Sequence, residues 1–201
     1  MFRFVLVLGV LFNTMSANAQ ATGFVQVEGV ADARSDTTIT LDAYTSLKFG
    51  HGLSGTAFLR VTDGWAQAYM GPAWAPTDWL EIGVSVGGQQ IDGKLDWRYA
   101  TSVWAGYGVF SFLGIVEFDN FVFQGDDAGV WYDLKAMAQP LEWLAVGVEA
   151  RRFVGVGPWV ELKVPSTPLS VWCTWAPIDP EKLDGQLGHL SRFMFGAKAS
   201  Y

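Results

Sequence analysis

The last eleven residues of the chain, SRFMFGAKASY, alternate between apolar and polar positions and end on an aromatic residue. One parity is apolar and carries Phe193, Phe195, Ala197, Ala199 and Tyr201. The other parity is more polar and carries Arg192, Met194, Gly196, Lys198 and Ser200. Because successive side chains of a strand point to opposite faces, this segment predicts a strand with two unlike faces. Half-buried strands of soluble sheets alternate in the same way, so this strand alone does not determine the fold class.

Eleven further segments read as strands, and turn signals separate them at spacings too short for helices. The twelve predicted strands span residues 23–34, 37–49, 53–62, 65–75, 79–88, 94–109, 111–123, 128–139, 143–152, 155–164, 168–176 and 189–201. In 37–49 the alternation is clear, because Ile39 and Leu41 face one way and Thr40 and Asp42 the other. In 111–123 both faces carry large apolar side chains. Ten strands are the alternative if 53–75 or 111–139 is misread.

The N-terminus has the pattern of a secretory signal peptide. Arg3 provides a positive start, residues 4–12 form an apolar run, and Ala17-Asn18-Ala19 matches the small-x-small cleavage signature. The apolar run is too short to span a bilayer as a helix, which needs about 20 apolar residues. We therefore expect residues 1–19 to be removed and residues 20–201 to form one domain.

The composition favours a membrane barrel. The chain is 50% hydrophobic and 15% aromatic but only 16% charged, whereas a typical soluble domain is about 25% charged. The signal peptide and the amphipathic last strand ending on Tyr201 resemble those of bacterial outer-membrane β-barrel proteins. That resemblance implies an all-β, transmembrane, up-and-down antiparallel barrel of twelve strands with short loops, in contact with outer-membrane lipid. It also implies that the last strand is the assembly signal read by the barrel assembly machinery. A soluble secreted β-sandwich is the rival fold.

The predicted topology sorts the connections into two sets. With a periplasmic N-terminus, the external connections are 35–36, 63–64, 89–93, 124–127, 153–154 and 177–188. The segment PTDWLEIGV from Pro76 is echoed by PLEWLAVGV from Pro140, both at periplasmic turns. Duplicated hairpins and convergence on a good turn both explain this echo. Either way, we expect Trp79, Trp143 and Tyr201 to lie in an aromatic belt at the membrane interface.

The polar parity predicts a charged barrel interior. Three consecutive predicted strands repeat an acid–base step on that face: Asp133/Lys135, Glu149/Arg151 and Glu161/Lys163. Because neighbouring strands lie about 4.8 Å apart, we expect these six side chains to form a continuous ladder of ion pairs on one wall. Further basic side chains of the same parity are expected in the interior, namely Arg60, Arg98, Arg192 and Lys198.

Two functional hypotheses follow from this interior. In the first, acidic and basic walls flank a narrow water-filled passage through which small solutes diffuse passively. In the second, the ladder satisfies the interior of a closed structural or adhesive barrel, because small barrels are commonly filled by side chains. Four inward tryptophans fit both hypotheses by plugging the lumen or by stacking on flat solutes: Trp104, Trp131, Trp159 and Trp172. We favour the channel, with its lumen narrowed by these rings.

A lipid hydrolase is the third hypothesis. His189 and Ser191 share the outward parity of the last predicted strand, which resembles the His-x-Ser arrangement of outer-membrane deacylases and phospholipases. Those families place Asn after the Ser, whereas Arg192 follows here, so we expect no enzymatic activity. The net charge of −7 argues against nucleic-acid binding. Cys173 is the single cysteine and excludes an internal disulfide, and no pattern predicts a metal or a cofactor.

Overall fold

The computed structural model describes residues 21–31, 37–91, 93–119, 129–178 and 192–201, and in these ranges the chain forms a closed β-barrel. The strands are β1 Ala21–Ala31, β2 Thr37–Gly50, β3 Leu53–Thr62, β4 Trp65–Thr77, β5 Leu80–Ile91, β6 Lys94–Tyr107, β7 Phe110–Asp119, β8 Val130–Leu141, β9 Leu144–Arg151, β10 Gly155–Lys163, β11 Leu169–Ala176 and β12 Arg192–Ser200. The twelve-strand prediction is confirmed and the ten-strand alternative is wrong. None of the described residues forms a helix long and apolar enough to cross a membrane.

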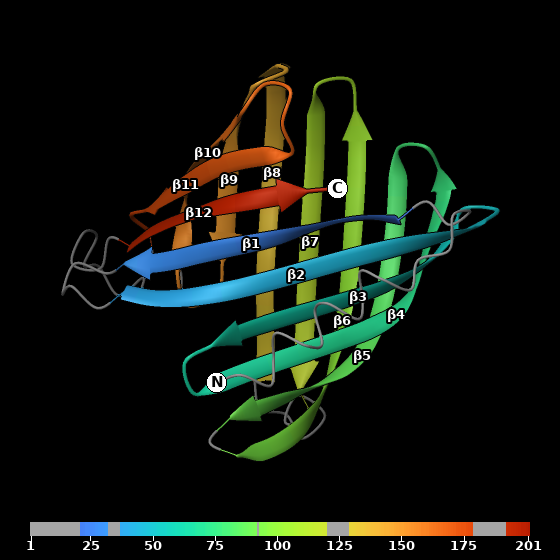
Figure 1. Cartoon of the computed structure of the whole chain (residues 1–201), viewed down its shortest axis with the longest axis vertical. Coiled ribbons are helices and arrows are strands. Elements are labelled where there is room, and N and C mark those ends of the chain that lie inside the picture. The colour runs from blue at the N-terminus through green and yellow to red at the C-terminus, as the bar shows by residue number, and fades with distance from the viewer. Residues whose placement is uncertain (1–20, 32–36, 92, 120–128, 179–191) are drawn as a thin grey trace.

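Every strand pairs antiparallel with the next, and β12 returns to pair with β1 and close the sheet. The closing seam places Val27 opposite Ala197, and two backbone hydrogen bonds join Gly23 and Tyr201 at 3.0 and 2.9 Å. In Figure 1 the strands of the front wall cross those of the back wall at a steep angle. This crossing is expected of a barrel, because its strands must tilt against the barrel axis to close.

The strand boundaries differ from the predicted ones at one informative place. Residues 89–93 were expected to be an external loop, but β5 continues to Ile91 and pairs with Lys94. The reason is that Gln89 is buried and accepts a hydrogen bond from Arg98, so a polar residue extends the strand. Residues 120–123 of the predicted strand 111–123 lie outside the described residues, and β7 is described over Phe110–Asp119. The proposed signal peptide lies outside the described residues.

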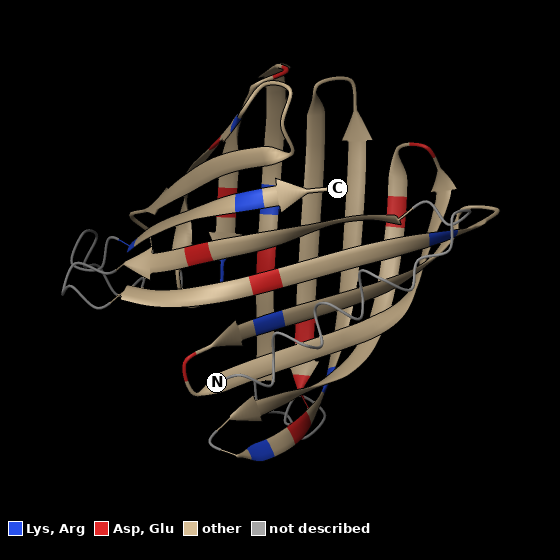
Figure 2. Ribbon diagram, viewed as in Figure 1, with Lys and Arg blue, Asp and Glu red and all other residues tan. Residues whose placement is uncertain are grey.

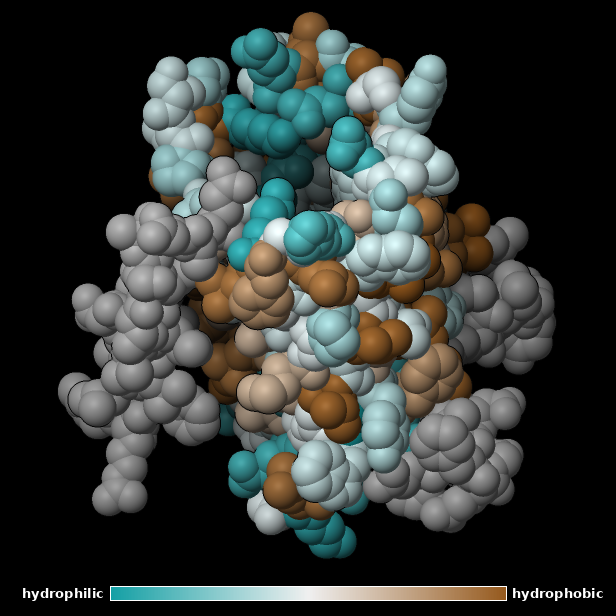
Figure 3. Space-filling view, turned by 90° about the vertical axis from the view of Figure 1, so that its right-hand side faces the viewer, coloured by the Kyte–Doolittle hydropathy of each residue, from teal (hydrophilic) through white to brown (hydrophobic). Residues whose placement is uncertain are grey.

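The barrel is built inside out compared with a soluble protein. Large apolar side chains such as Val148 and Trp175 are exposed on the outer surface, while Asp42, Glu149 and Thr174 are almost fully buried inside. In Figure 3 apolar side chains cover the middle of the visible face, and hydrophilic side chains gather toward its upper and lower ends. Alternation along each strand produces both surfaces at once, as a transmembrane barrel requires.

Glycines allow a tight turn between strands and the close approach of neighbouring strands. The turn between β3 and β4 is the two-residue loop Asp63-Gly64, with Gly64 at a φ of 72° that side chains disfavour. Inside β10, a Cβ added to Gly157 would lie 1.7 Å from the carbonyl oxygen of Trp175. Glycine is therefore required at this position for β10 and β11 to approach each other.

Candidate functional site

The register of the strands sets the charged side chains opposite one another inside the barrel. Asp42 on β2 lies directly across from Arg60 on β3. On the other wall, β8 and β9 pair so that Asp133 opposes Arg151 and Lys135 opposes Glu149. Figure 2 shows an acidic position of β1, an acidic position of β2 and a basic position of β3 near one another in the front wall. Asp42, Asp133 and Glu149 therefore each face a base on the neighbouring strand.

Arg60 is held by two strands of one wall. Its Nε and Nη2 donate to the two carboxylate oxygens of Asp42, both at 2.7 Å, and its Nη2 lies 3.5 Å from Glu28 on β1. Its guanidinium also lies 5.7 Å from the centre of the Phe58 ring and 5.5 Å from that of Trp131. This bidentate, ring-flanked geometry is one that Arg provides and Lys does not.

Arg151 contacts carboxylates on opposite sides of the barrel interior. It donates to Glu28 on β1 at 2.8 Å, to Asp133 on β8 at 2.7 Å and to Glu149 on its own strand at 3.4 Å. In the barrel, β10, β11 and β12 lie between β9 and β1, so the contact with Glu28 crosses the interior. The linked side chains, which we call the central network, are Glu28, Asp42, Arg60, Asp133, Lys135, Glu149 and Arg151.

A second group of polar side chains lies on the wall formed by β4 to β7. Arg98 donates to the Tyr69 hydroxyl and to Gln89, both at 3.0 Å, and lies 3.4 Å from Glu117. The Tyr69 hydroxyl donates in turn to Glu117 at 2.9 Å. All of these side chains are buried, so the group satisfies polar atoms that would otherwise be costly inside the barrel.

Apolar side chains fill the side of the barrel formed by β9 to β12. The buried members of this Trp–Met cluster are Ala145, Val154, Trp159, Trp172, Ala176 and Met194. Trp172 lies over Gly196, where a Cβ would come within 2.7 Å of its ring, and its Nε1 donates to Gln26 at 3.0 Å. Lys135 extends toward this cluster, 5.0 Å from the centre of the Trp159 ring. This part of the lumen is therefore plugged by side chains.

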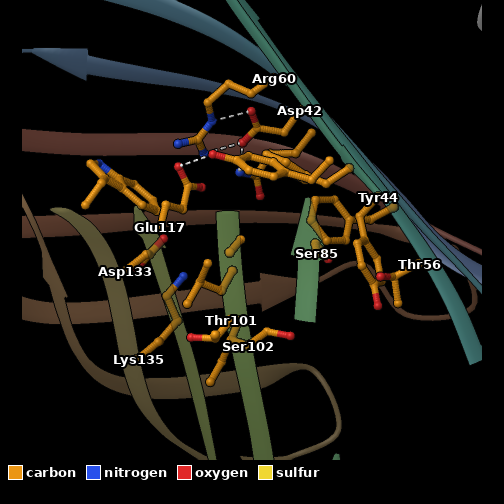
Figure 4. A pocket seen from close by; sticks show the side chains of 18 of the residues that line it. Asp42, Tyr44, Thr56, Arg60, Ser85, Thr101, Ser102, Glu117, Asp133 and Lys135 are labelled. Carbon is orange, nitrogen blue, oxygen red and sulfur yellow. Dashed lines mark hydrogen bonds and ion pairs between the residues drawn. The ribbon is translucent and has the colours of Figure 1, made fainter. Parts of the chain in front are cut away.

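The barrel also encloses free space. A cavity of about 200 Å³ is lined mainly by β1 to β8, with Arg151 of β9 and Lys198 of β12. Its lining combines rings, aliphatic side chains, hydroxyls and charges: Phe24, Gln26, Asp42, Tyr44, Thr56, Phe58, Arg60, Tyr69, Ser85, Ala100, Thr101, Ser102, Leu113, Ile115, Glu117, Trp131, Asp133, Lys135, Arg151 and Lys198. Figure 4 shows Arg60, Asp42 and Glu117 together at one side of this space and Ser102 at the other. The cavity thus ends against the central network.

The expected ladder exists in part. Between β8 and β9, Asp133 pairs with Arg151 and Lys135 pairs with Glu149. Glu161 and Lys163 on β10 do not extend this row of ion pairs. The register of β9 and β10 sets Glu149 opposite Gly157 and Glu161 opposite Ala145, so the acidic and basic positions do not meet. Instead, Glu161 binds Lys198 at 2.6 Å, and Lys163 donates to Gln139 at 2.8 Å. A continuous ladder over three strands is therefore wrong.

The other expected residues fall at several places. Arg192 is half-buried at the start of β12. Trp79, Trp143 and Tyr201 are exposed, and the connections that hold the two tryptophans lie at the barrel end where β1 begins and β12 ends. His189 and Ser191 lie outside the described residues, so the hydrolase hypothesis stays a prediction, which a Ser191→Ala comparison on labelled phospholipid would test.

The inward tryptophans do not share one environment. Trp159 and Trp172 are buried in the Trp–Met cluster, and the Trp131 ring centre lies 5.5 Å from the Arg60 guanidinium and 6.0 Å from that of Arg151. Trp104 is instead exposed.

Sequence reasoning missed the uncharged partners of the networks. Gln26, Gln67, Gln89, Tyr69 and Thr174 all bind buried charges. Gln26 shares its parity with Glu28 and Gln89 shares its parity with Glu81, so alternation could have identified these two. Strands β4 and β11 carry no charged residue that would mark the inward parity of Gln67, Tyr69 and Thr174. In the described ranges, no group of three or more His, Cys, Asp or Glu side chains could hold a metal ion.

Comparison with known proteins identifies the fold. No protein-family model matches the chain, and no curated protein matches it in sequence. Among solved structures, the NanC porin is similar with a TM-score of 0.55 and 9% identity, over 87% of this chain and 98% of that one. The KdgM porin is similar with a TM-score of 0.53 and 10% identity, over 89% and 99%. The Acinetobacter baumannii outer membrane protein Omp33 has a TM-score of 0.51 and 10% identity, over 92% and 100%. The chain therefore has the closed-barrel fold of bacterial outer-membrane porins.

Proposed function

We propose that this protein is a narrow passive channel for small solutes in the bacterial outer membrane. The observation that carries the proposal is the cavity of about 200 Å³ inside a closed barrel, bounded by the central network. A barrel that served only as a scaffold would gain stability by filling such a space, because empty volume forfeits packing contacts. The porin fold of the similar structures agrees with this function.

The location follows from the two surfaces of the barrel. Its outer surface is apolar over the middle, and exposed Trp79 and Trp143 lie at one end, as expected for a belt at the lipid interface. We infer that the last strand, which ends on Tyr201, is read by the barrel assembly machinery during insertion. Heat-modifiable migration on a detergent gel would support the membrane barrel, and extraction without detergent would contradict it.

The central network is the proposed constriction. Its side chains meet where Arg151 reaches Glu28 across the interior, and the Trp–Met cluster closes the neighbouring side. A solute that enters the cavity therefore passes along its walls and meets the acidic and basic side chains of the central network. In a pore with little water, such charges act more strongly than in bulk solvent and select solutes by charge and size.

A closed barrel without transport is the second candidate, and the Arg151–Glu28 contact favours it because it bridges the walls. The two candidates differ in a liposome-swelling assay with the refolded protein. The channel predicts rapid swelling with glycine and little or none with a disaccharide, because the passage is narrow. Swelling no faster than in protein-free liposomes for every solute would favour the closed barrel.

A further inference from the structure

Two ion pairs beside the cavity are oriented alike. Lys135 pairs with Glu149 at 3.2 Å, and Lys198 pairs with Glu161 at 2.6 Å. Both lysines line the cavity, whereas neither glutamate does. Each pair therefore presents its positive end to the free space and keeps its negative end in the wall behind.

The lysines are also the most accessible charges of the lining. The side chains of Lys198 and Lys135 are 25% and 15% exposed, compared with 13% for Asp133, 11% for Arg60 and 2% for Asp42. Among the described residues, each lysine has one carboxylate within 4 Å, although an ammonium group carries three N–H donors. Figure 4 shows Lys135 projecting into the space that the lining side chains enclose. The Lys135 ammonium also lies 5.0 and 5.4 Å from the ring centres of Trp159 and Trp172, so Lys198 is the more available donor for an additional anionic oxygen.

The remaining walls of the cavity suit an apolar body. Phe24 and Tyr44 stack with ring centres 5.7 Å apart on β1 and β2. On the other wall, the register sets Leu113 beside Lys135, so an aliphatic side chain adjoins an ammonium group. Pockets for small molecules typically combine apolar walls with a few polar groups that fix the orientation of the ligand.

We propose that the cavity binds a small amphipathic carboxylate, with its anionic group at Lys135 and Lys198 and its apolar body against the rings and aliphatic side chains. Glu149 and Glu161, which pair with the lysines, do not line the cavity and lie farther from such a ligand than the ammonium groups do. The acids that do line it, Asp42, Glu117 and Asp133, are each paired with an arginine. This inference deepens the proposed channel function by naming a solute class, and it rests on that function only for transport, not for binding.

The test is calorimetric titration of the full barrel in detergent micelles, with empty micelles subtracted. The probes are 3-phenylpropionate, its neutral amide, the corresponding amine and acetate. We expect 3-phenylpropionate to bind with a Kd in the micromolar to millimolar range, because a ligand of this size makes few contacts. The amide, the amine and acetate should each bind at least fivefold more weakly. Equal binding of all four probes, or tighter binding of the amine, would overturn the proposal.

Three variants locate the site. Lys198→Gln should weaken 3-phenylpropionate binding at least fivefold, since it removes a charge-assisted donor while keeping similar size. Lys163→Gln is the matched control, because Lys163 is also a lumen-facing lysine but does not line the cavity. The affinity of this variant for 3-phenylpropionate should be unchanged. Ser85→Trp keeps every charge and fills the cavity, so it should abolish binding. Unchanged binding in Lys198→Gln and Ser85→Trp would place the probe elsewhere and refute the site.

Binding and transport fail in different ways. If 3-phenylpropionate binds as expected but liposomes do not swell, the site stands and the channel function is wrong. If liposomes swell with glycine but 3-phenylpropionate does not bind, the channel stands and the ligand class is wrong.

Discussion

Removing the Arg151 guanidinium is the sharpest perturbation of the central network. Arg151→Met keeps a long side chain but leaves Glu28, Asp133 and Glu149 without a cation that contacts all three, at 2.8, 2.7 and 3.4 Å. All three carboxylates and the guanidinium are nearly buried, so water does not replace the lost partner. Breaking a buried ion pair from one side typically costs about 3–5 kcal/mol of unfolding free energy. We expect a loss in that range.

The assay is urea unfolding of the refolded barrel in lipid vesicles, followed by tryptophan fluorescence. The midpoint should fall while the slope of unfolding free energy against urea stays constant, since the exposed surface is unchanged. Lys94→Met at an exposed strand end is the control and should change the unfolding free energy by less than about 0.5 kcal/mol. Adding Asp133→Asn should recover part of the loss, because Arg151 is the one cation within 4 Å of that carboxylate among the described residues, whereas Glu28 keeps Arg60 and Glu149 keeps Lys135. A loss below about 1 kcal/mol for Arg151→Met would refute the network's role.

Two further predictions concern the faces of the barrel. A nitroxide attached to Cys173, which is exposed on the outward face of β11, should show high accessibility to oxygen and low accessibility to a water-soluble nickel complex in vesicles. The reverse pattern would contradict a lipid-facing position. Gly196→Ala should destabilise the barrel by about 1–3 kcal/mol, because its Cβ would overlap the buried Trp172 ring. In the same urea assay, Gly88→Ala should cost less, since its Cβ would lie 3.2 Å from the flexible end of Leu95 and 3.3 Å from the carbonyl oxygen of Asp96, which are tight contacts without overlap. Equal costs would contradict this packing.

The alternation of side chains was sufficient to predict the strands and their faces. Asp42 and Ile39 fall on the buried and exposed sides that their parity predicts. The same rule holds in β12, where Met194 is buried and Phe193 and Phe195 are exposed. The alternation of side chains is a local property of each strand, so the face that a residue occupies can be predicted without knowing the partner strands.

The contacts inside the barrel were harder to predict, because they depend on register and closure. Glu161 was expected beside Glu149 and Arg151, but the pairing of β9 with β10 sets it against Ala145 and leaves it to Lys198. The contact of Arg151 with Glu28 joins residues 123 positions apart and requires a closed barrel. Alternation fixes which face a residue occupies but not its height along the barrel.

The most direct test of the channel is single-channel recording of the refolded barrel in a planar bilayer under a salt gradient. We predict discrete conductance steps, together with a reversal potential that shifts toward cation preference in Lys198→Gln, because that variant removes the most accessible positive charge of the cavity. Lys163→Gln should leave the reversal potential unchanged. The absence of conductance steps at every salt concentration would contradict the channel.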